Sequence, residues 1–271
     1  MDIAGRVVVV TGAGSGIGAA ICRKVADLNA SGVVVSDINF DAAEAVAASL
    51  DSDKDRVIPL CCDVSSEAEI QSLVRQAIEK FGRIDIFCSN AGITARDGLE
   101  CSNKDWQRLW DVNVMSRMYA ARAVVPHMLE SGGGYLLHTA SAAALLTEIG
   151  SAGYSVTKHA DLAMAEWLSV CYGRQGIRVS CICPLGVYTD MLDDSDPIHR
   201  YLHLHALTAD QVADSVVEGI RKEEFLILPQ PEVAEFFQLK AEDRDRWIRG
   251  MQRLRQKLTR AIQRTADSDA A

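Results

Sequence analysis

The sequence lacks several features that define whole classes of protein. No apolar segment approaches the roughly 18 residues that a membrane-spanning helix needs. The first five residues, Met1 to Gly5, carry no basic segment, so we expect no signal peptide and predict a cytoplasmic protein. There is no linker rich in proline, glycine or serine and no internal repeat. We therefore predict one domain without a membrane span.

Positive charge is in deficit. The chain of 271 residues has 28 Lys and Arg against 37 Asp and Glu, which gives a net charge of −9. An acidic surface repels phosphate backbones, so we expect no nucleic-acid partner. The apolar share of 48% and the charged share of 24% exclude a disordered, collagenous or coiled-coil protein.

The eight cysteines form no Cys-x-x-Cys motif. Cys181 and Cys183 are two residues apart in an apolar segment, so both should face one side of a strand. Because no further metal ligands stand at suitable spacing, we predict no metal site. We interpret the cysteines as buried, reduced thiols that pack as small hydrophobic groups.

Short β-branched segments alternate with longer helical patterns. Strands are predicted at 6–11, 33–36, 57–60, 84–89, 135–139, 177–183 and 225–228. Helices are predicted at 17–29, 41–50, 66–80, 106–130, 154–172 and 208–222. The alternation, with strands that are apolar throughout, predicts an α/β protein. We expect a doubly wound Rossmann fold, with about seven parallel strands and helices on both faces of the sheet.

The segment after residue 230 differs from the rest of the chain. It is dense in charge, and Trp247, Ile248, Met251 and Leu254 follow at helical spacing. We predict an amphipathic helix that packs on the body or on a neighbouring subunit. The alternative is a solvated helix with a frayed end at 265–271.

A glycine-rich loop joins the first predicted strand to the first predicted helix. Gly12 and Gly16 follow Thr11, and Gly18 lies in the first turn of the predicted helix. Glycine lets the backbone turn tightly and lets a pyrophosphate approach the main chain, while the helix N-terminus offers free N–H groups. A tight strand-to-helix turn is the alternative, but it does not need so many glycines.

The spacing Gly12-x-x-x-Gly16-x-Gly18, the segment Asn90-Ala91-Gly92 and the pair Tyr154-x-x-x-Lys158 occur in this order. Together they resemble the short-chain dehydrogenase/reductase family over about residues 5–228. The resemblance implies hydride transfer between a nicotinamide cofactor and a small-molecule alcohol or ketone. It also implies a homodimer or homotetramer.

Four residues are the predicted catalytic set. Tyr154 and Lys158 are four apart on one helix face, where an ammonium can lower the pKa of a phenol and make it an acid/base. The resemblance implies that Ser141, thirteen residues before Tyr154, polarises the substrate carbonyl. It implies that Asn113 holds a water in a proton relay to Lys158. Alternatively, an asparagine in mid-helix only bends the helix or bonds to the backbone.

Asp37 ends the second predicted strand, nineteen residues after Gly18. A carboxylate there can accept hydrogen bonds from the ribose hydroxyls and would repel a 2′-phosphate, so the predicted cofactor is NAD. The alternative is that Asp37 only caps the following turn. Asp63 and Val64 match the family's adenine contact, although Asp63 could instead be a helix N-cap. The predicted cofactor-binding residues are Gly12, Ser15, Gly16, Ile17, Gly18, Asp37, Asp63, Val64, Asn90, Ala91, Gly92, Tyr154, Lys158, Pro184, Val187 and Thr189.

Two features bear on the substrate. Leu185 stands where the family usually has glycine, so it should narrow the pocket or redirect the loop. The loop from Asp190 to about Leu207 holds Pro197, His199, Tyr201, His203 and His205. Its three histidines at alternate positions could suggest a metal site, but we predict a mobile lid. The predicted pocket wall is mostly apolar and favours a neutral, hydrophobic alcohol or ketone. It consists of Thr94, Ala95, Ala142, Ala143, Leu145 and Met191.

We therefore predict an NAD-binding catalytic Rossmann domain at 1–230. Residues 231–271 are predicted to be a charged helical extension of the same domain. The alternative function is a non-catalytic dinucleotide-binding or redox-sensing protein on the same fold. The set of Asn113, Ser141, Tyr154 and Lys158 favours the enzyme.

Overall fold

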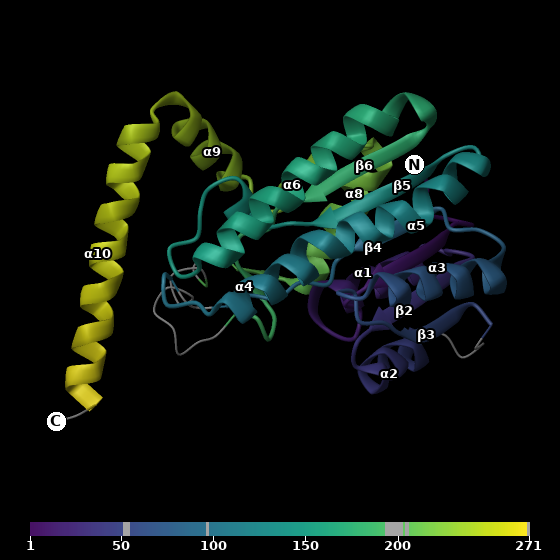
Figure 1. The fold of residues 1–271 in the computed structure, drawn as a ribbon, viewed down its shortest axis with the longest axis horizontal. Coiled ribbons are helices and arrows are strands. Elements are labelled where there is room, and N and C mark those ends of the chain that lie inside the picture. The colour runs from purple at the N-terminus through teal and green to yellow at the C-terminus, as the bar shows by residue number, and fades with distance from the viewer. Residues whose placement is uncertain (51–54, 96–97, 193–202, 204–205, 270–271) are drawn as a thin grey trace.

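The computed structural model describes residues 1–50, 55–95, 98–192, 203 and 206–269. They form a seven-stranded parallel sheet with helices on both faces, so the predicted fold class is confirmed (Figure 1). No helix in these ranges is both long enough and apolar enough to span a membrane.

The strands lie in the order β3-β2-β1-β4-β5-β6-β9. Their bounds are β1 (Val7–Thr11), β2 (Gly32–Asp37), β3 (Val57–Cys61), β4 (Ile86–Ser89), β5 (Gly134–Thr139), β6 (Ile177–Ile182) and β9 (Leu226–Ile227). The direction of winding reverses between β1 and β4. A crevice forms at such a switch point, outside the carboxyl ends of the strands. A small second sheet, in which β7 (Val187–Tyr188) pairs with β8 (Leu207–Thr208), is an element for which the sequence gives no clear pattern.

Helices cover the sheet on both sides. Their bounds are α1 (Gly16–Asp27), α2 (Phe40–Leu50), α3 (Glu67–Phe81), α4 (Asn103–Trp110), α5 (Ser116–Glu130), α6 (Ala152–Tyr172), α8 (Ala209–Lys222), α9 (Glu232–Glu242) and α10 (Arg244–Asp269). One core cluster lies between the sheet and α3, α5 and α6, and a second lies between the sheet and α1, α2 and α8.

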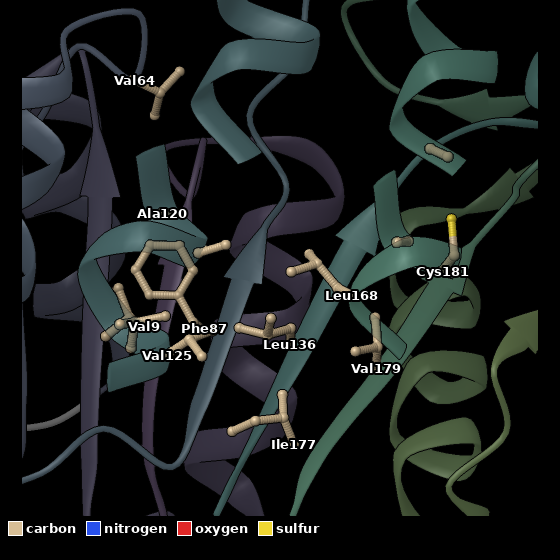
Figure 2. Close-up of a cluster of buried hydrophobic side chains, with 14 of the residues drawn as sticks. Val9, Val64, Phe87, Ala120, Val125, Leu136, Leu168, Ile177, Val179 and Cys181 are labelled. Atoms are coloured by element: carbon tan, nitrogen blue, oxygen red, sulfur yellow. The ribbon is translucent and has the colours of Figure 1, made fainter. Parts of the chain in front are cut away.

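The two clusters explain why the strands are apolar throughout. Val9, Phe87 and Leu136 belong to the first cluster (Figure 2). Val8 and Val10, the neighbours of Val9, belong to the second. Since successive side chains of a strand point to opposite faces, burial of both faces requires an apolar residue at nearly every position.

The long helical region predicted at 106–130 is confirmed, but it is not one uniform α-helix. α4 ends at Trp110, a π-helical turn runs from Asp111 to Met115, and α5 begins at Ser116. Asn113 lies in the π-helical turn, where its side chain bonds to the backbone of Ile93 and to Thr157. A π-helical turn inserts an extra residue into an α-helix and is frequent at functional sites.

The expectation that every cysteine is buried is also wrong, because Cys61 and Cys171 are exposed. Cys61 ends the edge strand β3, which has no outer neighbour to cover it. Cys181 and Cys183 are buried as predicted. Burial raises the pKa of Cys88 to about 12, which keeps this thiol protonated.

The C-terminal segment forms two helices instead of the single one predicted. Asp243 has an extended backbone and separates α9 from α10. α10 stands beside the body of the molecule rather than against the sheet (Figure 1). Its helical backbone continues to Asp269 and so includes most of the segment for which a frayed end was expected.

Candidate active site

A cavity of about 1060 Å³ opens at the crevice between β1 and β4. Every predicted cofactor-binding residue except Gly18 lines this cavity, and so does Ser141. Asn113 lies behind the wall and is fully buried. The fold therefore brings side chains from distant parts of the chain to one site.

The glycine loop leaves no room for a side chain at three of its glycines. Gly12 has a φ of +63°, and a Cβ there would lie 2.7 Å from Cα of Ala91. A Cβ on Gly16, whose φ is +53°, would lie 3.1 Å from the Thr189 methyl group. A Cβ on Gly18 would lie 2.2 Å from the Gly12 carbonyl oxygen. Gly18 thus lets α1 approach the loop closely, which explains why it is absent from the cavity wall.

The N-terminus of α1 faces the cavity with unused donors. Its first helical bond runs from the Ala19 N–H to the Ser15 carbonyl, so the preceding N–H groups have no acceptor within the helix. No side chain caps this end, and its first turn holds no carboxylate. Free N–H groups and the positive end of the helix dipole suit an anion such as a pyrophosphate.

Asp37 accepts two backbone hydrogen bonds at the edge of the cavity. One oxygen accepts from the Gly14 N–H at 2.9 Å, and the other accepts from the Asn39 N–H at 2.9 Å. The alternative role as a turn cap is therefore present in the structure. A carboxylate has about four acceptor sites, so two remain for ribose hydroxyls. Capping and ribose binding are compatible at this residue.

Asp63 is not the N-cap of α3. That position belongs to Ser66, whose side chain accepts from the Glu69 N–H. One Asp63 oxygen instead accepts from both the N–H and the hydroxyl of Ser65, at 2.9 and 2.7 Å. Asp63 and Val64 both line the cavity. The carboxylate is thus held against the wall where an adenine contact was predicted.

Tyr154 and Ser141 line the same cavity, and the Ser141 hydroxyl is close enough to lower the pKa of Tyr154 in part. Tyr154 lies in the first turn of α6, where the hydroxyl of Ser151 accepts its N–H at 3.1 Å. Ser141 follows β5, and its hydroxyl oxygen accepts the Ala143 N–H at 3.1 Å. The first cap fixes the backbone at the start of α6, and the second fixes the Ser141 hydroxyl on the cavity wall.

Lys158 is buried beside this pair. Its Nζ lies 5.5 Å from the centre of the Tyr154 ring and donates to the Thr139 carbonyl at 2.8 Å. Burial, followed by the charge of Arg117, lowers the pKa of Lys158 to about 8. The ammonium is thus held by a backbone oxygen on the cavity wall.

The expected lowering of the Tyr154 pKa is wrong for this protein without cofactor. Burial raises the pKa of Tyr154 well above its ordinary value, and the nearby Ser141 hydroxyl offsets this only in part. The reason is physical: a phenolate in an apolar site loses its hydration, and the lysine nitrogen is directed at Thr139.

Asn113 bonds to the backbone, as its alternative interpretation held. Its Oδ1 accepts the Ile93 N–H at 2.9 Å, and its Nδ2 donates to the Ile93 carbonyl at 2.9 Å. A Cβ added to Gly92 would lie 3.3 Å from Nζ of Lys158 and 3.4 Å from Oδ1 of Asn113. Asn113 therefore holds the backbone at Gly92 and Ile93, which lies between its side chain and Lys158.

Sequence reasoning missed a buried ionic network behind Lys158. Nε of Arg117 lies 3.3 Å from one oxygen of Asp161, and Nδ1 of His138 lies 2.8 Å from the other. Arg117 also donates to the Ala91 carbonyl at 2.7 Å. The side chains of Arg117 and Asp161 are 1% and 0% exposed. Arg117 and Asp161 are charged residues at core-facing positions of α5 and α6, and this placement was the sequence signal that could have indicated the network.

The predicted substrate wall is only partly right. Thr94, Ala142, Ala143 and Met191 line the cavity, whereas Ala95 and Leu145 do not. Leu185 lines it and also packs against the core. Of the predicted lid, residues 193–202 and 204–205, including Pro197, His199, Tyr201 and His205, lie outside the described residues. Among the described residues, no group of His, Cys, Asp and Glu side chains is placed to hold a metal ion.

The fold and this site together define a dinucleotide-binding α/β protein of the doubly wound class. Residues 6–198 match the family model described as short chain dehydrogenase. The chain belongs to the short-chain dehydrogenase/reductase family.

Three similar proteins illustrate the likeness. The 1-deoxy-11-beta-hydroxypentalenate dehydrogenase of Streptomyces exfoliatus is 34% identical over 231 residues, which cover 84% of each chain. A Burkholderia phymatum short-chain dehydrogenase/reductase solved with NAD has a TM-score of 0.83 at 30% identity, covering 90% of this chain and 96% of that one. A 7α-hydroxysteroid dehydrogenase solved with NADH and 7-oxo glycochenodeoxycholic acid has a TM-score of 0.77 at 28% identity, covering 83% and 93%.

Proposed function

We propose that this protein is an NAD-dependent oxidoreductase that interconverts a secondary alcohol and its ketone. The observation that carries the proposal is that Ser141, Tyr154 and Lys158 line the same cavity as the glycine loop and Asp37. A dinucleotide held by that loop and a substrate oxygen held by the two hydroxyl groups would share one space.

Each catalytic side chain has a separate task. Ser141 orients the substrate oxygen, and Tyr154 takes the alcohol proton or returns it to the carbonyl oxygen. Bound NAD supplies the hydride acceptor and a positively charged nicotinamide ring. Lys158 supports the tyrosine with a second positive charge and binds the nicotinamide ribose. Asn113 keeps the segment beside the lysine in place.

The cofactor choice rests on Asp37. Its carboxylate faces the cavity with acceptor sites to spare and repels a 2′-phosphate. The two related structures solved with NAD and NADH support this choice. The names of the related dehydrogenases point to hydroxyl or oxo groups on their substrates, and the apolar wall of Ala142 and Ala143 favours a neutral substrate.

The test is a panel of secondary alcohols with NAD, followed by the absorbance of the reduced nicotinamide. Tyr154→Phe should retain NAD binding but lose about 10²- to 10⁴-fold in turnover, because it removes the acid/base. Tyr172→Phe is the matched control, since Tyr172 lies at the other end of α6 against Trp167. Near-normal turnover in Tyr154→Phe would refute the mechanism. NAD binding without oxidation of any alcohol would favour a non-catalytic dinucleotide-binding protein.

A further inference from the structure

Lys240 anchors α9 to the loop after β5, which carries Ser141 and is called the catalytic loop below. Its side chain is buried, and Nζ donates to the carbonyls of Leu145 and Leu146 at 2.6 and 2.8 Å. These carbonyls lie just beyond the short turn that begins at Ser141. A buried ammonium is costly unless it is hydrogen-bonded, and burial lowers the pKa of Lys240. The contact therefore ties the C-terminal extension to the loop that carries the catalytic serine.

Gln230 makes a second buried tie. Its side-chain oxygen accepts the Leu185 N–H at 3.1 Å, and its Nε2 donates to the Gly186 carbonyl at 2.8 Å. This pair of bonds holds the loop after β6, where the sequence departs from the usual family pattern. Two loops of the active site are thus held by Gln230, just before α9, and by Lys240, near the end of α9.

An apolar face of the α9–α10 hairpin lines the same cavity as Tyr154. Its side chains recur at helical spacing along both helices; they are Phe236, Leu239, Trp247, Met251, Leu254 and Leu258. Ile248, on another side of α10, is 46% exposed and does not line the cavity. α10 stands beside the body at this end of the molecule (Figure 1). The hairpin therefore faces the catalytic residues across the cavity.

The cavity extends from the predicted dinucleotide site, past Tyr154, to the hairpin. Its volume of about 1060 Å³ includes the space beside the glycine loop, Asp37 and Asp63 that a dinucleotide would take, so the character of the hairpin wall, and not the volume, bears on the substrate. The charged residues that line it on the hairpin are of both signs and include Glu242, Asp243, Arg246 and Arg253. This mixture gives no preference for an anion, whereas the apolar face suits a hydrocarbon body.

We propose that the α9–α10 hairpin is the outer wall of the substrate site, and that it selects alcohols or ketones with a bulky, apolar body. Lys240 and Gln230 act as positioning residues that hold this wall against the catalytic loops. Trp247 and Met251 determine specificity by contact with the part of the substrate remote from its oxygen. This inference rests on the proposed function and adds the size class of the substrate.

The experiment compares two secondary alcohols that differ in bulk, cyclohexanol and decahydro-2-naphthol. In Trp247→Ala, the ratio of kcat/KM for the bicyclic alcohol to that for cyclohexanol should fall about tenfold or more, mainly through KM, because an apolar contact is lost. Ile248→Ala is the matched control on the neighbouring position of α10 and should leave the ratio within twofold.

Lys240→Met tests the anchor separately. Methionine retains an apolar chain of similar length but cannot donate to the two carbonyls. We expect the same loss of selectivity as in Trp247→Ala. NAD affinity, measured by calorimetry, should stay within twofold of the wild type and so shows that the dinucleotide site is folded.

An unchanged ratio in both Trp247→Ala and Lys240→Met would overturn the proposal. So would a lower oligomeric mass of Trp247→Ala by light scattering with its selectivity intact, because the face would then be a subunit interface. If the wild type oxidised neither of these two alcohols, the result would count against the proposed function and not against the wall. Calorimetric binding of 2-decalone to the protein with NADH would then test the wall alone. Trp247→Ala should weaken that binding about tenfold and Ile248→Ala should not, whereas equal binding would overturn the proposal.

Discussion

Replacing Arg117 with methionine should destabilise the protein severely. Arg117 and Asp161 lie 3.3 Å apart with side chains that are 1% and 0% exposed. Removing one partner leaves a buried charge with insufficient compensation, which typically costs about 3–5 kcal/mol. The loss is a large part of the roughly 5–15 kcal/mol by which a domain is stable. At about 2–4 °C per kcal/mol, the melting temperature should fall by roughly 6–20 °C.

Urea unfolding at equilibrium measures this loss. Arg122→Met is the matched control, because Arg122 lies on the same helix in an ion pair with Glu67 whose arginine side chain is 58% exposed. Such a surface pair contributes roughly 0–1 kcal/mol. The double variant Arg117→Met with Asp161→Leu should be less destabilised than Arg117→Met alone, since it leaves no unpaired carboxylate. A loss in Arg117→Met no larger than in Arg122→Met would refute the reasoning.

Two further predictions concern Lys158 and Asp37. The folded protein releases the Lys158 proton near pH 8, whereas the unfolded chain retains it to about pH 10.5. The unfolded state therefore binds more protons in this window, and this residue's contribution to stability rises with pH, by at most about 1.4 kcal/mol per pH unit. In urea unfolding, the wild type should gain about 1–2 kcal/mol relative to Lys158→Met between pH 8 and pH 9.5; a constant or shrinking difference would contradict this. Asp37→Ala combined with Ile38→Arg should shift the kcat/KM preference from NAD towards NADP, because a repulsive carboxylate is replaced by an arginine. Equal use of both cofactors by the wild type would count against the role of Asp37.

The features of the fold that could be predicted from the sequence are those that depend on local sequence patterns. Apolar segments separated by helical patterns indicated seven parallel strands, because a strand buried on both faces must be apolar throughout. The glycine loop could be read because its glycines are close in sequence and each answers a local steric demand. The same patterns failed where a tertiary contact overrode them. The π-helical turn at Asn113 interrupts a periodic segment because its side chain bonds to Ile93, twenty residues away.

The sequence by itself determined the fold class, the family resemblance and the residues that meet in the cavity, since these depend on periodicity and on short motifs. Only the tertiary structure decided what surrounds them. Arg117 finds Asp161 across 44 residues, and Lys240 reaches the Leu145 carbonyl across 95. Burial, which no local pattern measures, raises the pKa of Tyr154 where its lysine neighbour alone suggested the opposite. Desolvation and long-range hydrogen bonds arise only when the chain is folded, so the outer wall of the site and the charge state of its acid/base belong to the structure.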